Sequence, residues 1–237
     1  MASDHGDQLP LVLIPGMMCD ARLFAPQIAA LSQTRRVITL LPTDHDSMAD
    51  LARDLLAKAP SRFALCGLSM GGIVAMEMLR QAPNRVARLA LLDTNSRAEM
   101  PATQDKRAPQ MAAVRQGHLA RIMREEMIPN YAHPDHPTPE LDALALDMAR
   151  DLGSEVFLRQ SRALRDRPDQ TETLERFTGP ALILMGQGDR LCPQDRHAQM
   201  ARAIPHARYV ILPDTGHLST LQAPQQVTSA LKIWLRS

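Results

Sequence analysis

Short apolar runs alternate with amphipathic stretches along the first hundred residues. Continuous apolar runs suit strands that are buried on both faces, whereas apolar residues three or four positions apart suit helices. This pattern predicts strands at 9–16, 36–42, 62–67 and 85–93, with helices at 20–34, 46–60 and 70–83. Strands that alternate with helices at such short intervals favour a parallel sheet covered on both faces.

The pattern changes at about residue 97, where polar and proline-rich stretches begin. No further strand is expected before about residue 170, and the predicted helices are 109–127, 139–152 and 153–167. The alternation then returns, with strands and helices at 180–186, 193–204, 207–213 and 223–237. The sequence therefore predicts an α/β core, residues 1–96 and 171–237, interrupted by an all-helical insertion at 97–170.

A serine lies at the corner between one predicted strand and the helix that follows it. Gly67-Leu68-Ser69-Met70-Gly71 matches the pattern G-x-S-x-G, and this strand-to-helix context makes the short pattern specific. Such a corner strains the serine backbone, needs small residues two positions away on either side, and faces free helix N–H groups. We therefore interpret Ser69 as a nucleophile. The alternative is an ordinary turn in which the serine caps the helix.

A serine hydroxyl becomes a good nucleophile only when a base takes its proton and a third group orients that base. Asp189 and His217 each follow a predicted strand in the second half of the chain. Ligands bind beyond the carboxyl ends of parallel strands, so Ser69, Asp189 and His217 should meet at one edge of the sheet. Taken singly, both partners are ordinary loop residues, and Asp93 competes with Asp189 for the role of the acid.

Together these motifs resemble the α/β-hydrolase superfamily over nearly the whole chain. The residues that carry the likeness are "LVLIPGMM", "CGLSMGG", "LLD", "LMGQGDRLCP" and "DTGHLS". The resemblance implies a mostly parallel sheet of about six strands flanked by helices, with 97–170 as a helical lid. It favours Asp189 over Asp93, because "GxGD" at a strand end has the family's form. The compact chain is similar to small bacterial carboxylesterases, including those that cleave methyl esters of acyl chains.

An oxyanion hole is expected beside the serine. The helix start supplies the backbone N–H of Met70, and the resemblance implies the N–H of Met17 as the second donor. Many relatives have His-Gly where this chain has Pro15-Gly16, so no side-chain contact is expected from that position. The residues expected to contact the substrate are Gly16, Met18, Leu68, Phe157 and Leu218.

The chemistry expected of these groups is hydrolysis of a small to medium carboxylic ester through an acyl-enzyme, without a metal or an organic cofactor. The same residues could instead cleave a lactone, an amide, a thioester or a carbon–carbon bond. Outside enzymes, the alternative is a ligand receptor built on a hydrolase scaffold.

Composition and charge restrict the partners of this 237-residue chain. Its net charge of +1 gives no reason to expect nucleic acid or an anionic membrane. The three cysteines are far apart and odd in number, which excludes a disulfide framework, and no Cys/His cluster has zinc-site spacing. The polar N-terminus is unlike a signal peptide, and no apolar run approaches the roughly 18 residues of a membrane helix. We therefore expect a cytoplasmic monomer or homodimer acting on a small-molecule ester.

A row of arginines in the insertion bears on a possible protein partner. Arg159, Arg162 and Arg165 lie at helical spacing and could dock an acidic carrier protein. Such a row is more often a solvated helix face, and this is the interpretation that we favour.

Overall fold

The apolar runs form one six-stranded sheet in the computed structural model, which describes residues 8–237. All neighbouring strands are parallel, in the order β2-β1-β3-β4-β5-β6. The strands are β1 Leu11–Ile14, β2 Val37–Thr39, β3 Phe63–Leu68, β4 Val86–Leu92, β5 Ala181–Gly186 and β6 Arg208–Leu212. Every residue of β1, β3 and β5 is buried, as expected for strands covered on both faces. The predicted fold class is confirmed.

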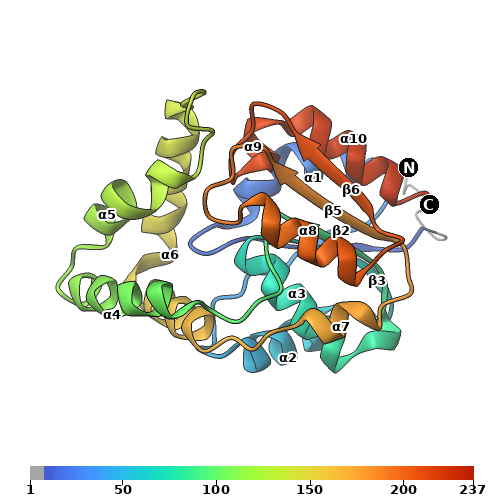
Figure 1. Ribbon diagram of the computed structural model, residues 1–237, viewed down its shortest axis with the longest axis horizontal. Coiled ribbons are helices and arrows are strands. Elements are labelled where there is room, and N and C mark those ends of the chain that lie inside the picture. Colours follow the sequence, from blue (N-terminus) through green and yellow to red (C-terminus); the bar gives the residue numbers. More distant parts are fainter. Residues whose placement is uncertain (1–7) are drawn as a thin grey trace, which may run out of the picture.

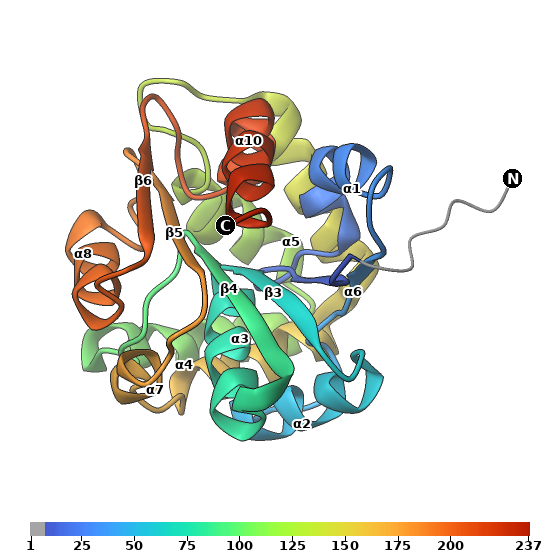
Figure 2. The same cartoon turned by 90° about the vertical axis from the view of Figure 1, so that its right-hand side faces the viewer.

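Helices cover both faces of this sheet (Figures 1 and 2). One face carries α1 Ala25–Leu31 and α10 Pro224–Trp234, which also pack against each other. The other face carries α2 Met48–Lys58, α3 Met70–Gln81 and α8 Gln194–Ala203. Apolar side chains from all five helices pack with the strands in one continuous core.

Between β4 and β5 the chain forms helices and adds no strand to the sheet. These are α4 Pro101–Arg115, α5 Leu119–Ile122, a π-helical turn Met123–Met127, a 3₁₀ turn Ile128–Asn130, α6 Pro139–Arg165 and α7 Thr171–Glu175. Helices α4, α5 and α6 lie beyond the carboxyl ends of the strands (Figure 1). Gly153, with a φ of 79°, interrupts α6 at the boundary predicted between two helices.

The helix predicted at 109–127 begins too late and misses a break in the middle, although the π-helical turn does end at the predicted Met127. Helix α4 begins eight residues earlier, at Pro101, because the missing N–H of proline is not needed in the first turn. The helix ends before Gly117, whose φ of 89° is left-handed. The sequence pattern also does not predict α7 or α9 Ser219–Gln222, because four or five residues carry too little periodicity.

None of the helices within residues 8–237 has both the length and the apolar character needed to cross a bilayer. The expectation that the N-terminus is not a signal peptide stays a prediction, because residues 1–7 lie outside the part of the chain that the structure describes. The three cysteines are free and buried.

The sheet and α3 approach each other so closely at Gly71 that a side chain does not fit. A Cβ atom built there would lie 1.9 Å from the carbonyl oxygen of Ile14. We expect Gly71→Ala to lower the free energy of unfolding by about 3 kcal/mol or more, because backbone atoms must shift. Urea unfolding followed by circular dichroism measures this loss.

Gly117→Ala is the matched control for that measurement. A Cβ atom at Gly117 meets no atom of the described part of the chain within 4 Å, so the left-handed backbone is what opposes the substitution. We expect a cost of about 1 kcal/mol. Equal losses for the two variants would contradict the close approach of α3 to β1.

Candidate active site

Ser69 lies at the corner between β3 and α3 with the strained backbone that the pattern predicts. Its φ is 55° and its ψ is −121°. The Ser69 N–H donates to the carbonyl of Leu92 at 3.0 Å, and the Thr94 hydroxyl donates to the Ser69 carbonyl at 2.7 Å. The side chain makes no capping hydrogen bond to α3, so the alternative of a helix-capping serine does not hold. Neighbouring strand ends therefore hold the strained backbone and leave the hydroxyl free.

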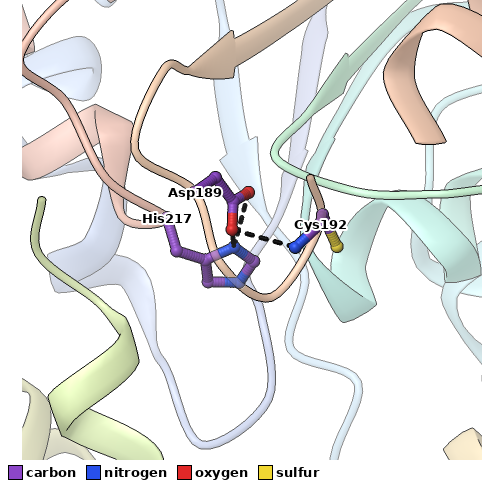
Figure 3. Close-up of side chains that lie close together, drawn as sticks. All are labelled: Asp189, Cys192 and His217. Carbon is purple, nitrogen blue, oxygen red and sulfur yellow. Dashed lines mark hydrogen bonds and ion pairs between the residues drawn. The ribbon is translucent and has the colours of Figure 1, made fainter. Parts of the chain in front are cut away.

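The three residues expected to act together meet beyond the strand ends. Ser69 Oγ lies 2.9 Å from His217 Nε2. His217 Nδ1 lies 2.9 Å from each carboxylate oxygen of Asp189, and Figure 3 shows these two side chains pointing toward one another. A neutral imidazole with its proton on Nδ1 donates to Asp189 and accepts from Ser69 at Nε2. This arrangement can remove the serine proton and stabilise the resulting imidazolium.

Burial and charge act in opposite directions on His217, which is only 2% exposed. Burial lowers the pKa of its imidazolium, but the charge and hydrogen bond of Asp189 outweigh burial, so the net pKa is raised above 6.5. The backbone N–H groups of Leu191 and Cys192 each donate to Asp189 Oδ1 at 2.9 Å. These two donors fix the carboxylate that orients the imidazole.

A pH profile tests this electrostatic balance. His217 must be neutral to accept the serine proton, and a raised pKa keeps it protonated to higher pH. We therefore expect kcat/KM for an ester to fall toward acid with a midpoint above pH 6.5. The measurement is kcat/KM at constant ionic strength from about pH 5 to 9. A midpoint at or below 6.5 would show that Asp189 does not outweigh burial.

Asp93, the competing acid, is buried close to these groups but makes no hydrogen bond to His217 within residues 8–237. It accepts hydrogen bonds from the Gly186 N–H at 2.9 Å and from the Ser219 hydroxyl. Burial, followed by the charge of Asp189, raises the pKa of Asp93 to about 8. A carboxyl group that stays protonated at neutral pH cannot stabilise an imidazolium, so the geometry and the charge both favour Asp189.

The expected oxyanion donors face the same cavity as Ser69. Gly16, Met17, Ser69 and Met70 all line it. The loop that carries Met17 comes close to the serine, since a Cβ atom on Gly16 would lie 3.2 Å from Ser69 Cβ. Neither the Met17 nor the Met70 N–H has a hydrogen-bond acceptor among the described residues. Both amides are therefore available to an oxyanion.

Gln160 of α6 supports the loop that carries Met17, one of the two expected oxyanion donors, and the sequence pattern does not predict this contact. Its side-chain oxygen accepts from the Met18 N–H at 2.9 Å, and its side-chain nitrogen donates to the Pro42 carbonyl at 3.0 Å. Gln160 is completely buried. The available signal was a glutamine on the apolar face of a predicted helix, where a buried polar group needs partners.

The cavity beside Ser69 has a volume of about 440 Å³. Of the residues expected to contact substrate, Gly16 and Leu218 line it. Met18, Leu68 and Phe157 do not line it, and all three are fully buried in the core. Leu68 is next to Ser69 in the chain, but successive residues at a strand end point to opposite faces. Met18 follows β1 in a turn with a positive φ of 55° and is buried in the core. Phe157 lies on α6, and helical phase alone does not show which neighbour a helix packs on.

Tyr131 from the insertion was also missed. It lines the cavity, and its ring is stacked on His217 with 6.2 Å between the ring centroids. Its carbonyl accepts from the Leu218 N–H at 3.1 Å. No motif marks a lone tyrosine in a polar loop, so only the fold brings it to the imidazole.

Asp189, Cys192 and His217 lie close enough together to be considered as metal ligands (Figure 3). Their ligand atoms are within 4.8 Å of one another. However, both nitrogens of His217 already have partners in Ser69 and Asp189. Burial, followed by the charge of Asp189, raises the pKa of the Cys192 thiol well above 9.0, whereas metals bind the thiolate. The cluster therefore fits proton transfer better than metal binding.

The arginine row of α6 is engaged within the chain. Arg159 donates to the Thr43 carbonyl at 2.7 Å, and Arg162 lies 3.4 Å from the Asp46 carboxylate. These contacts tie α6 to the loop before α2. Arg165, the third arginine of the row, lies 2.7 Å from the carboxylate of its neighbour Asp166. Each arginine therefore has a partner within the chain, which agrees with the interpretation of a solvated helix face.

Comparison with known proteins places the chain among hydrolases and related proteins. The family model described as "Alpha/beta hydrolase family" matches residues 11–230. A thermophilic esterase from Thermogutta terrifontis, solved with malate bound, has a TM-score of 0.88 and 31% identity, covering 98% of this chain and 90% of that one.

Two relatives extend this comparison. The pimeloyl-[acyl-carrier protein] methyl ester esterase of Nitrosomonas europaea is 28% identical, over 97% of this chain and 98% of that protein. The dihydrolipoyllysine-residue acetyltransferase component of the acetoin cleaving system of Pseudomonas putida is 30% identical over 96% of this chain. The chain spans only 63% of the length of that acetyltransferase component.

Proposed function

The chain belongs to the α/β hydrolase family, and from this membership we propose that it is a serine hydrolase that cleaves a small to medium carboxylic ester. Ser69 attacks the ester carbonyl while His217 takes its proton, and Asp189 stabilises the imidazolium. The N–H groups of Met17 and Met70 bind the oxyanion. His217 then protonates the leaving alcohol, and water activated by the same histidine hydrolyses the acyl-enzyme.

One observation carries this proposal: the unbroken contact from Asp189 through His217 to Ser69. Both steps measure 2.9 Å, within the range in which a proton can pass along a hydrogen bond. An ester is the preferred substrate because two of the compared proteins are named esterases. Lactones, amides, thioesters and activated carbon–carbon bonds need the same groups and differ in the shape of the pocket.

We also propose that residues 97–170 act as a lid. This segment supplies about half of the residues that line the cavity, including Tyr131 against His217. It also supplies Gln160, which holds the oxyanion loop. A segment that both covers the cavity and braces the loop can exclude water during the reaction.

A panel of p-nitrophenyl esters of rising acyl length tests the function. Wild-type protein should release p-nitrophenol with a kcat/KM that peaks at short or medium chains, since about 440 Å³ holds only a small ligand. A fluorophosphonate probe should label Ser69 quickly and completely, which peptide mass spectrometry measures. A folded protein that neither turns over an ester nor reacts with the probe would instead favour the ligand-receptor alternative.

A further inference from the structure

The cavity that contains Ser69 is lined by an excess of positive charge. Among residues 8–237, only two carboxylates line it, Glu99 and Glu126. Six cationic side chains line it: Arg97, Lys106, Arg107, Arg167, Arg190 and Arg196. The whole chain has a formal net charge of only +1, so positive charge is concentrated at this cavity. This excess has no role in the chemistry of an uncharged ester.

Two of these arginines share one carboxylate away from solvent. Arg107 Nε donates to Glu99 Oε2 at 2.6 Å, and Arg167 Nη1 lies 2.8 Å from Glu99 Oε1. The side chains of Arg107, Arg167 and Glu99 are 10%, 7% and 4% exposed. The cluster therefore holds two positive charges and one negative charge at the cavity wall. One positive charge has no counterion in the cluster.

Burying a charge without a counterion has an unfavourable desolvation free energy, and the pKa of Arg167 reflects this penalty. Burial lowers the pKa of the Arg167 guanidinium, although the charge of Glu99 partly offsets the effect. Arg107 Nη1 and Arg167 Nη2 have no hydrogen-bond acceptor within residues 8–237. An anion in the cavity would supply both the missing charge and the missing acceptors.

Arg196, in α8, is a further arginine of the cavity wall whose guanidinium is not fully paired. Its Nη1 atom is buried and has no hydrogen-bond partner among the described residues. Arg196 and Arg97 share a single carboxylate, that of the exposed Asp195, at 3.6 and 3.5 Å. The cavity thus has a second arginine pair with one acidic partner.

We propose that the cluster of Arg107, Glu99 and Arg167 binds a carboxylate of the substrate, which is then a half-ester with a free carboxylate at the end remote from the scissile bond. The inference rests on the proposed function and adds the substrate class. A planar guanidinium matches a carboxylate in two parallel hydrogen bonds. A single negative charge neutralises the cluster, whereas a phosphate monoester, at about −1.5 to −2 near neutral pH, would leave it negative.

Matched half-esters test this inference. The monomethyl esters of succinate, glutarate and adipate are compared with analogues in which the free carboxylate is a carboxamide. Hydrolysis adds water across the ester bond to give methanol and an acid, and methanol release measures it for both series. At the best chain length, wild-type kcat/KM should favour the carboxylate by about 10- to 100-fold, the value of a bidentate charge-assisted contact.

Variants localise the preference. Arg167→Gln should reduce the carboxylate-to-carboxamide ratio of kcat/KM toward one, because Glu99 then pairs with Arg107 alone. Arg53→Gln is the control, since Arg53 is exposed on α2 and does not line the cavity. It should keep the wild-type ratio. If Arg167→Gln does not fold, as judged by circular dichroism, Arg196→Gln tests the same charge excess and should lower the ratio.

Competition and binding separate this inference from the proposed function. Glutarate should inhibit more strongly than inorganic phosphate, and the reverse order would overturn the carboxylate assignment. Turnover of both series without preference at any length would also overturn it and leave the esterase function standing. If wild type cleaves no ester, calorimetry with Ser69→Ala still decides the carboxylate site. Tighter binding of monomethyl glutarate than of its carboxamide supports the site, and equal binding refutes it.

Discussion

Ser69→Ala should lower kcat for a p-nitrophenyl ester by about 10⁶-fold. The hydroxyl is the only nucleophile in contact with His217 among the described residues, at 2.9 Å, and alanine has no atom to attack the carbonyl. Binding should change little, because the cavity wall and the free Met17 and Met70 amides remain. The measurement is kcat at saturating substrate. The concentration of folded protein is taken from an unfolding curve, because a fluorophosphonate cannot label a variant that lacks Ser69.

Ser61→Ala is the control for that variant. Ser61 is exposed just before β3, at the opposite end of the strand that leads to Ser69. It should retain wild-type kcat and full reaction with a fluorophosphonate. Turnover by Ser69→Ala equal to that of wild type would refute both the nucleophile and the acyl-enzyme.

Asp189→Asn should lower kcat by about 10⁴-fold while the fold and the ester KM change much less. The amide nitrogen of asparagine can donate to His217 Nδ1, which places the imidazole proton on Nε2. An imidazole in that tautomer cannot accept the proton of Ser69. Stopped-flow measurement of the acylation burst separates this loss from slow release of the product.

Asp93→Asn provides the matched comparison, because Asp93 is the other buried carboxyl group at this edge of the sheet. Its raised pKa, about 8, keeps it neutral at pH 7, so a neutral amide preserves the charge. We expect a loss in kcat of less than about tenfold. A larger loss from Asp93→Asn than from Asp189→Asn would transfer the acid role to Asp93.

The sheet and the placement of the proposed catalytic residues were predictable from the sequence. Short apolar runs that alternate with amphipathic stretches favour strands of a covered parallel sheet, and β1, β3 and β5 are fully buried runs of this kind. Parallel strands place their carboxyl ends at one edge, so the residues after three strands meet there. Ser69, Asp189 and His217 follow β3, β5 and β6, and the glycines around Ser69 reveal the tight corner.

The lining of the cavity depends on the tertiary structure. The hydrophobic pattern of the helices between β4 and β5 does not show which face of each helix is buried. Their first residues are also hard to predict, because α4 begins at a proline, Pro101. Which face of α6 meets the core and which meets the cavity is set by the elements it packs against, not by periodicity, and Gln160 contacts Met18 and Pro42 of the core. Phe157 was therefore misplaced, and Gln160 was missed.

The sequence by itself determined which groups we propose to react, because the proposed chemistry needs particular residue types at the ends of recognisable strands. Only the tertiary structure decided what surrounds them. Arg107 and Arg167 pair with the same buried carboxylate, that of Glu99, although up to 68 positions separate the three residues in the chain. Charges that compensate one another through space leave no periodic pattern in the sequence, since the free energy of burying them depends on distance and solvent exclusion.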